Sequence, residues 1–92
     1  MVRQRRVSRV VWHWRIPITD NMEMLMPDGT RVIHFGLRNG ELTIWTLLDP
    51  SKSQRLRRFR LAGTGHPISE IDLRYIGTCF QESLVWHLFE VV

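Results

Sequence analysis

The sequence predicts an all-β fold, a small antiparallel barrel or sandwich of about six to seven short strands with at most one short helical turn. Three observations support this prediction. Apolar and polar residues alternate in most segments, turn residues separate these segments at short, even spacing, and no long window has the apolar spacing of an amphipathic helix. With 92 residues, 43% of them hydrophobic, the chain has room for one compact core. We expect a basic, flexible arm at residues 1–9 and a single β-rich domain at residues 10–92.

The first predicted strand covers residues 10–18. Its apolar even positions are Val10, Trp12, Trp14, Ile16 and Ile18. This period of two predicts one buried face, and Pro17 indicates an edge position or a strand end because proline cannot donate to a ladder. Residues 19–21 then predict a turn, residues 22–27 a short strand, and residues 28–29 another turn.

Asn39 and Gly40 lie between two β-rich runs, which predicts a hairpin with a type I′ turn because both central residues need positive φ. A two-residue loop fixes the register. The expected pairs are Arg38 with Glu41, Leu37 with Leu42, Phe35 with Ile44, and His34 with Trp45. One face would hold Ile33, Phe35, Leu37, Leu42 and Ile44. On the other face we expect Trp45 to cover the space left by Gly36, and we expect this hairpin to form the centre of the sheet.

The next strand is expected in the segment from Gln54 to Gly63, where two adjacent arginines interrupt the alternation. Either a bulge lies at these arginines or the strand begins at Arg58. Beyond that point Phe59 and Leu61 face inward, whereas Arg58 and Arg60 face outward.

Two further strands are expected at residues 74–81 and 84–92, joined by a short link around Glu82 and Ser83. The segment 67–72, which precedes these two strands, is the only one in the sequence that offers a helical turn, with Pro67 at its start.

The formal net charge of +4 comes almost entirely from arginine, because Lys52 is the only lysine. Arginine suits anionic partners, although a merely soluble basic surface explains the same charge. Cys79 is the only cysteine, so no internal disulfide is possible and a reducing cytoplasm is the simplest location. His13 and Arg15 interrupt the one stretch that resembles a signal peptide, and no apolar run approaches the ~20 residues of a spanning helix. We therefore expect a soluble protein without membrane contact.

The segment from Gly63 to Ile68 combines two glycines, a hydroxyl side chain, a histidine and a proline. Backbone amides around Thr64 could form a nest for an anion, with two arginines just upstream and a histidine as a further donor. A tight turn at the strand exit explains the glycines equally well. The candidate ligand- or partner-binding residues are Arg58, Arg60, Gly63, Thr64, Gly65 and His66.

Other chemistry has little support in the sequence. The spacing of His13, His34 and His87 matches no metal-ligand motif, and a lone Cys79 does not complete a zinc set. A cysteine in an apolar strand is more often buried than nucleophilic. We expect no metal, no cofactor and no catalytic residue, and hence a protein that is not an enzyme.

The aromatic and basic side chains leave open the hypothesis that the protein binds nucleic acid. The tryptophans are Trp12, Trp14, Trp45 and Trp86, and the basic residues of the arm are Arg3, Arg5, Arg6 and Arg9. Together they could stack bases and bind phosphates. Alternation with polar residues instead favours core positions for the tryptophans. For the arm, the alternative is a solvated chain terminus that binds nothing. The methionines of the 22–26 segment could face a partner, but more often methionine fills a core.

Three pieces of sequence carry a resemblance to a known family: GTGHPI at 63–68, RYIGT at 74–78 and LVWHLFE at 84–90, together with RIPITD and WTLLDP upstream. From about Trp12 to Glu90 the chain resembles small proteins of unassigned function encoded by tailed phages and prophages. It departs from their pattern in its arginine-rich start, in its NMEMLM segment and in lacking a glycine-rich turn before LVWH.

The resemblance implies a viral protein that acts by binding in the cytoplasm of a host bacterium. We expect an inhibitor used in host takeover or counter-defence, which binds a host protein or sequesters a small phosphorylated ligand such as a nucleotide. The alternative is a nucleic-acid-binding accessory protein that uses its arginines. A chain this small with several strand edges also predicts a two-fold homodimer that covers one edge.

Overall fold

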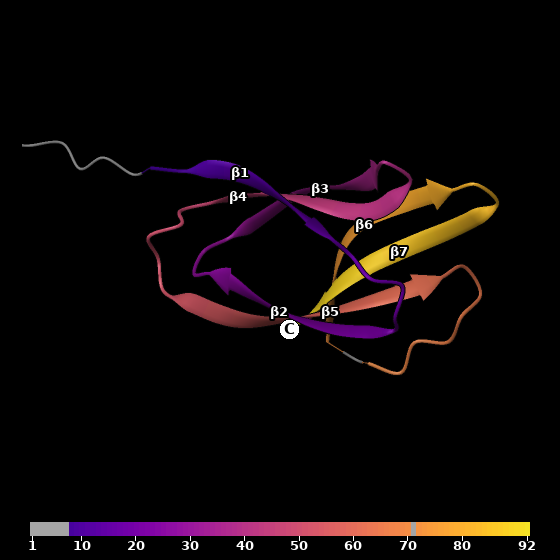
Figure 1. The fold of residues 1–92 in the computed structure, drawn as a ribbon. Helices are drawn as coiled ribbons and strands as arrows, with labels where there is room; N and C mark the ends of the chain where they lie inside the picture. Colours follow the sequence, from indigo (N-terminus) through magenta and orange to yellow (C-terminus); the bar gives the residue numbers. More distant parts are fainter. Residues whose placement is uncertain (1–7, 71) are drawn as a thin grey trace, which may run out of the picture.

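The computed structural model describes residues 8–70 and 72–92 as a sandwich of two antiparallel sheets (Figure 1). The strands are β1 (Val10–Arg15), β2 (Asn21–Pro27), β3 (Arg31–Arg38), β4 (Glu41–Leu48), β5 (Gln54–Gly63), β6 (Leu73–Gln81) and β7 (Leu84–Val91). One sheet has the order β1-β4-β3 and the other the order β2-β5-β7-β6. The all-β prediction is confirmed, and of its two alternatives the sandwich is the one that forms.

The described residues contain no helix, and so none that is long and apolar enough to cross a membrane. The prediction allowed at most one helical turn, and the segment that offered it forms none in its described part, residues 67–70. There the chain is irregular, and the Pro67 carbonyl accepts a hydrogen bond from Arg60.

The hairpin of β3 and β4 has the predicted register, from Arg38 opposite Glu41 to His34 opposite Trp45. Asn39 and Gly40 have φ values of 52° and 76°, as a type I′ turn requires. The hairpin is nevertheless not the centre of one large sheet, because β3 is an edge strand and β4 alone is central in its three-stranded sheet.

A bulge between Val32 and His34 corrects the predicted inner face of β3. It shifts the alternation by one residue, so that Val32 packs against the core and Ile33 is exposed. The space above Gly36 is filled by the ring of His34 and not by Trp45, since a Cβ on Gly36 would lie 2.7 Å from His34 Nε2.

β1 is an edge strand, and only its C-terminal end reaches the core. Ile16, just beyond the strand, is buried, and Trp14 packs against the core and donates a 2.7 Å hydrogen bond to the Thr46 hydroxyl. Val10, Trp12 and Ile18 are exposed, so the prediction of one buried face from residue 10 to residue 18 holds only for Trp14 and Ile16.

β5 pairs with β2 without interruption from Gln54 onward, so neither a bulge nor a late start exists at the adjacent arginines. Phe59 and Leu61 are buried as predicted, and Arg58 is exposed. Arg60 lies on the outer side of the sheet but is only 6% exposed, which contradicts its expected solvent exposure. Arg57 shares the inner side with Phe59, with its guanidinium carbon 5.8 Å from the centre of that ring.

The core lies between the two sheets. Its buried cluster consists of Ile16, Met22, Met26, Phe35, Leu42, Ile44, Phe59, Leu61, Cys79 and Leu88. Two methionines of β2 are thus core residues, as their sequence pattern indicates. The edge strands β3 and β6 approach closely at Gly77, where an added Cβ would lie 3.3 Å from Phe35 Cβ.

β6 and β7 form the predicted C-terminal hairpin around Glu82 and Ser83. Glu82 has a φ of 53°, an uncommon value for a residue with a long side chain. β7 lies between β5 and β6, so the last hairpin is attached to the strand that ends at the glycine-rich segment.

Candidate functional site

The segment after β5 is the predicted turn. The His66 amide donates a 3.0 Å hydrogen bond to the Gly63 carbonyl, which closes a four-residue turn. Gly65 at its third position has a φ of 89°, a conformation that favours glycine. The Thr64 amide also donates to the Val85 carbonyl at 3.1 Å, so the turn is bound to the start of β7.

The His66 side chain folds back over Gly63. A Cβ on Gly63 would lie 2.9 Å from His66 Cε1, and the Gly63 amide donates to His66 Nδ1 at 3.3 Å. Because Nδ1 accepts this bond, the neutral ring carries its proton on Nε2. His66 is exposed and borders a small pocket of about 160 Å³ together with the first residues of β7.

Arg60 is enclosed by backbone and carboxylate oxygens. Its guanidinium donates to the carbonyls of Asp20, Leu61 and Pro67 at 3.0 to 3.1 Å, and to the Glu70 carboxylate at 3.2 Å. These bonds attach the β5–β6 connection and the β1–β2 connection to the sheet. Arg60 therefore stabilises the segment around the turn rather than presenting its charge to solvent.

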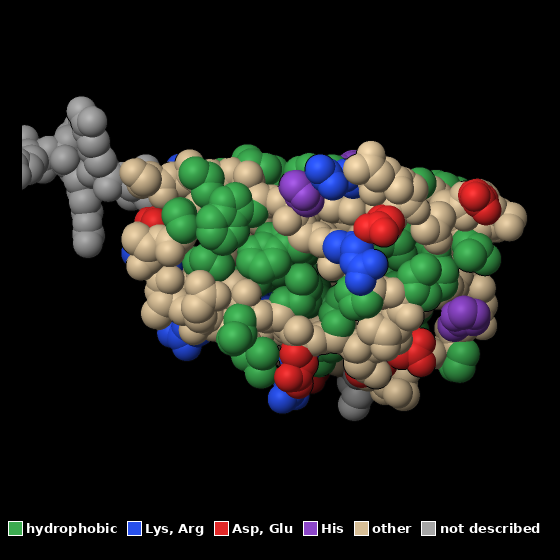
Figure 2. Space-filling model, viewed as in Figure 1, with side chains coloured by type: hydrophobic (Ala, Val, Ile, Leu, Met, Phe, Trp, Pro, Cys, Tyr) green, Lys and Arg blue, Asp and Glu red, His purple; other side chains and the backbone are tan. Residues whose placement is uncertain are grey.

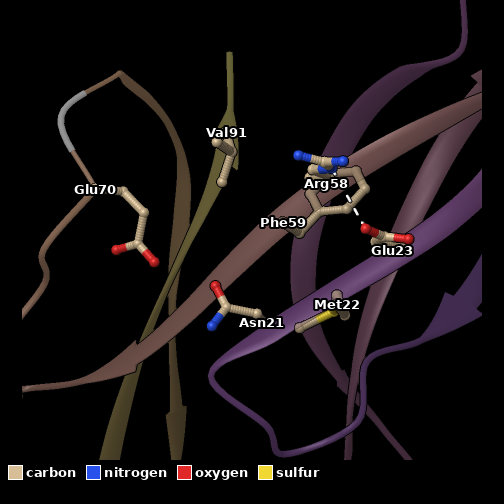
Figure 3. Close-up of a pocket in the computed structure, with 7 residues that line it drawn as sticks. All are labelled: Asn21, Met22, Glu23, Arg58, Phe59, Glu70 and Val91. Carbon is tan, nitrogen blue, oxygen red and sulfur yellow. Dashed lines mark ion pairs between the residues drawn. The ribbon is translucent and has the colours of Figure 1, made fainter.

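Arg58 borders a pocket of about 570 Å³ (Figure 3). The lining residues are Asn21, Met22, Glu23, Arg58, Phe59, Glu70 and Val91. Arg58 and Glu23 form an exposed ion pair of 3.3 Å on one side, and the carboxylate of Glu70 lies across the pocket. With two carboxylates and one guanidinium, this pocket has a formal charge of −1 and does not suit an anion.

The six predicted residues thus occupy three different places. Arg58 lies at the pocket that Glu23 and Glu70 also border, and Arg60 lies beneath the β5–β6 connection. Gly63, Thr64 and His66 border the small pocket, and Gly65 supplies the bend of the turn between them. The structure therefore does not bring the two arginines and the glycine-rich turn into one anion nest.

Thr64 instead joins a chain of hydrogen-bonded side chains on the outer side of the four-stranded sheet. Its hydroxyl lies 2.7 Å from His87 Nε2, and His87 Nδ1 lies 3.0 Å from the Thr78 hydroxyl. The chain ends at Tyr75, whose hydroxyl lies 2.7 Å from that of Thr78. A neutral imidazole has one donor and one acceptor nitrogen, so one threonine donates to His87 and the other accepts from it.

A bulge in β6 makes this chain possible. Tyr75 and Thr78 are three residues apart and would lie on opposite sides of a regular strand. The register shift between Tyr75 and Gly77 places both on the outer side, opposite Phe89 and His87 respectively. Ile76 at the bulge packs against the core instead.

Aromatic side chains flank the chain on the same side of the sheet. Tyr75 is 59% exposed and packs edge-on against Phe89 with ring centres 5.8 Å apart, and Phe80 is 69% exposed. We define the outer face as the surface formed by Thr64, Tyr75, Thr78, Phe80, His87 and Phe89. Only Thr64 among them was a predicted site residue. One sequence signal could have located this surface: GTGHPI, RYIGT and LVWHLFE, the segments that carry the family resemblance, each contribute residues to it.

On the outer face a hydroxyl and an imidazole lie side by side, with no carboxylate hydrogen-bonded to the ring. A hydroxyl beside an imidazole, as in Thr64 and His87, is the pairing of an activated nucleophile. Here the second ring nitrogen meets the Thr78 hydroxyl rather than a carboxylate that would stabilise an imidazolium. Cys79 is buried in the core, and desolvation raises the pKa of its thiol, which makes it a poor nucleophile. Residues 8–70 and 72–92 contain no cluster of three metal-ligating side chains.

Most arginines of the sandwich are paired with carboxylates. The paired ones are Arg15, Arg55, Arg57, Arg58, Arg60 and Arg74. Arg3, Arg5 and Arg6, which lie outside the described residues, supply three of the four net positive charges, so residues 8–92 carry a formal charge of only +1. Figure 2 shows the result on one side of the molecule, where acidic and basic side chains are interspersed among hydrophobic ones.

Comparison with known proteins yields one family. The model of a domain of unknown function (DUF7352) matches residues 7–92. No curated protein and no solved structure matches the chain.

Proposed function

The chain belongs to the DUF7352 family of domains, and we propose that it is a non-enzymatic binding protein whose recognition surface is the outer face. One observation carries the proposal. Two large aromatic side chains, Tyr75 and Phe80, are more than half exposed beside an ordered series of hydrogen-bonding groups. Exposed apolar surface next to fixed polar groups is typical of protein interfaces, in which aromatic residues are enriched.

The bound partner is proposed to be a protein. Tyr75 is held in place by Phe89 and by its hydrogen bond to Thr78, so little conformational freedom remains to be lost on binding. Rigid tyrosine side chains of this kind often contribute much of an interface's binding energy. An apolar surface of the partner would cover Phe80, and its backbone or side-chain polar groups would hydrogen-bond to the hydroxyls around His87.

The resemblance to phage-encoded proteins gives the proposal its context. The partner would be a protein of the host bacterium, met in the host cytoplasm, and binding would inhibit it in host takeover or counter-defence. A second copy of this chain is the other protein that could cover the outer face, which would correspond to the expected homodimer.

Charge placement argues against the nucleic-acid alternative for the sandwich itself, because its arginines are mostly paired and its formal charge is only +1. Nucleic-acid binding would have to rely on the arm. If it occurs, affinity should fall with salt at a slope of about −0.9 per phosphate contact on duplex DNA, and removing residues 1–7 should abolish it.

Affinity capture from host lysate tests the proposal. The full chain serves as bait beside a double variant, Tyr75→Ser with Phe80→Ser. A matched control, Leu25→Ser with Leu56→Ser, removes a pair of facing leucines that are 60% and 53% exposed at the opposite edge of the same sheet. We expect one partner in stoichiometric amount with the wild type and the control, and its loss with the outer-face variant at an unchanged Tm. Loss with the control, or retention by the outer-face variant, would refute the proposal.

A further inference from the structure

A second pocket, of about 360 Å³, opens between the edge strands of the two sheets. Arg31 of β3, Arg57 of β5, Arg74 of β6 and Glu90 of β7 supply its charged lining. Three guanidiniums against one carboxylate give it a formal charge of +2, opposite in sign to the charge of the pocket beside Arg58. This surplus of arginine suits an anionic ligand.

Glu90 and Arg57 form the fixed base of the pocket. Arg57 Nε and Nη2 donate to the two oxygens of Glu90 at 2.7 Å each, and its Nη1 donates to the Thr30 carbonyl. Both side chains are largely buried, at 16% and 9% exposed. The hydrogen bond from Arg57 is the largest of the effects that lower the pKa of Glu90, so this carboxylate remains charged at neutral pH. Its charge is therefore already balanced by Arg57.

Arg74 and Arg31 retain donors for a ligand. Arg74 donates Nη2 to Glu90 at 2.6 Å while its side chain is 63% exposed, so Glu90 orients a guanidinium that has several N–H groups left over. Arg31 is exposed at the rim, and none of the ion pairs among the described residues involves it. Two guanidiniums beside one pocket can each offer a planar fork of donors to the same oxyanion.

We propose that this pocket binds a phosphate dianion, free or as the end group of a small ester, held between Arg31 and Arg74. A phosphate presents several oxygens to both forks at once, which a single carboxylate does less well. The pocket is larger than a phosphate group needs, and the apolar side chains of Val32 and Ile76 line the remaining space. The proposal does not depend on the function proposed for the outer face, although Tyr75 borders both.

Calorimetric titration of the full chain at low salt and neutral pH tests whether the pocket binds phosphate. The probes are inorganic phosphate, adenosine 5′-monophosphate and adenosine. We expect saturable binding of the phosphate-bearing probes and none of adenosine. Tighter binding of the monophosphate would identify a small ester as the ligand, and equal binding would identify free phosphate. The absence of saturation by both up to about 10 mM would overturn the proposal.

Three arginine variants localise the binding. Arg31→Ala and Arg74→Ala should each weaken it by about tenfold or more, whereas Arg38→Ala, exposed on the same strand as Arg31 but outside the pocket, should leave it unchanged. Arg74→Gln repeats the test with a side chain that can still hydrogen-bond to Glu90. Wild-type affinity in Arg31→Ala and Arg74→Gln, or an equal loss in Arg38→Ala, would overturn the assignment. Phe80→Ser should retain phosphate binding, so this test fails or succeeds independently of the outer face.

Discussion

The Thr64 hydroxyl lies 2.7 Å from Nε2 of His87, so the turn that ends β5 is joined through a side chain to the middle of β7. The two residues are 23 positions apart in sequence. Their contact, together with the bond from the Thr64 amide to Val85, connects the glycine-rich turn to the C-terminal hairpin.

Replacing Thr64 by valine should therefore weaken the turn without affecting the core. Valine keeps the shape of the side chain but removes one exposed hydrogen bond, so we expect a loss of about 0.5–1 kcal/mol in the free energy of unfolding. Urea denaturation measures this loss, and amide exchange at Gly65 should become faster than in the wild type. Unchanged stability together with unchanged exchange would mean that the contact with His87 contributes nothing.

Arg60 and Arg58 should differ sharply when each is replaced by alanine. Arg60 is buried with four hydrogen-bonded oxygens that would lose a charged donor, so Arg60→Ala should cost about 2–4 kcal/mol. Arg58→Ala breaks only an exposed pair with Glu23 and should cost less than about 1 kcal/mol. Arg60→Lys should not restore stability, because an ammonium cannot reproduce the planar fork. Equal effects of the two alanine variants in thermal or urea unfolding would contradict the buried role of Arg60.

Glu90 should make the fold sensitive to acid. The hydrogen bond from Arg57 lowers its pKa in the folded protein, so the unfolded chain binds its proton at a higher pH than the folded chain does. The stabilisation is complete above the unfolded pKa of about 4.3 and is lost as pH falls through the lower folded value. Urea unfolding between about pH 3 and pH 7 should show this loss.

Glu90→Gln is the variant for that measurement. It should be less stable at neutral pH by roughly 3 kcal/mol, because Arg57 is left buried without a carboxylate. It should also show a shallower decline in acid, although not a flat one, since the pKa values of Asp49 and Glu70 are lowered as well. The same acid slope in the variant and the wild type would show that Glu90 is not the responsible group.

Local sequence predicted the parts of the fold that depend on neighbouring residues. The turn at Asn39 and Gly40 fixed the register of β3 and β4 from the turn as far as His34 opposite Trp45, because a two-residue loop leaves only one pairing. The positive φ of Gly65 was predictable in the same way from the composition of its turn. The bulge at Ile33 was not, because both possible alternations placed an apolar residue on the core side.

The candidate site depended on contacts that sequence order conceals. The alternation of apolar and polar residues in β5 assigns Arg60 to the exposed side of the strand. The segment from Pro67 to Glu70 nevertheless covers it. The outer face required β7 to insert between β5 and β6, which brings Thr64 beside His87, and a bulge in β6 that turns Thr78 outward. Neither the strand order nor the bulge can be recognised from the alternation of apolar and polar residues in the sequence.

Site-specific photo-cross-linking in host cells tests whether the outer face is the recognition surface. A photoreactive residue is placed at position 80, and a matched one at position 25, which is similarly exposed at the opposite edge of the same sheet. We expect position 80 to cross-link to one host protein and position 25 not to cross-link to it. Cross-linking of the same protein from position 25, no product from position 80, or a product from position 80 that is only a second copy of the chain would contradict it.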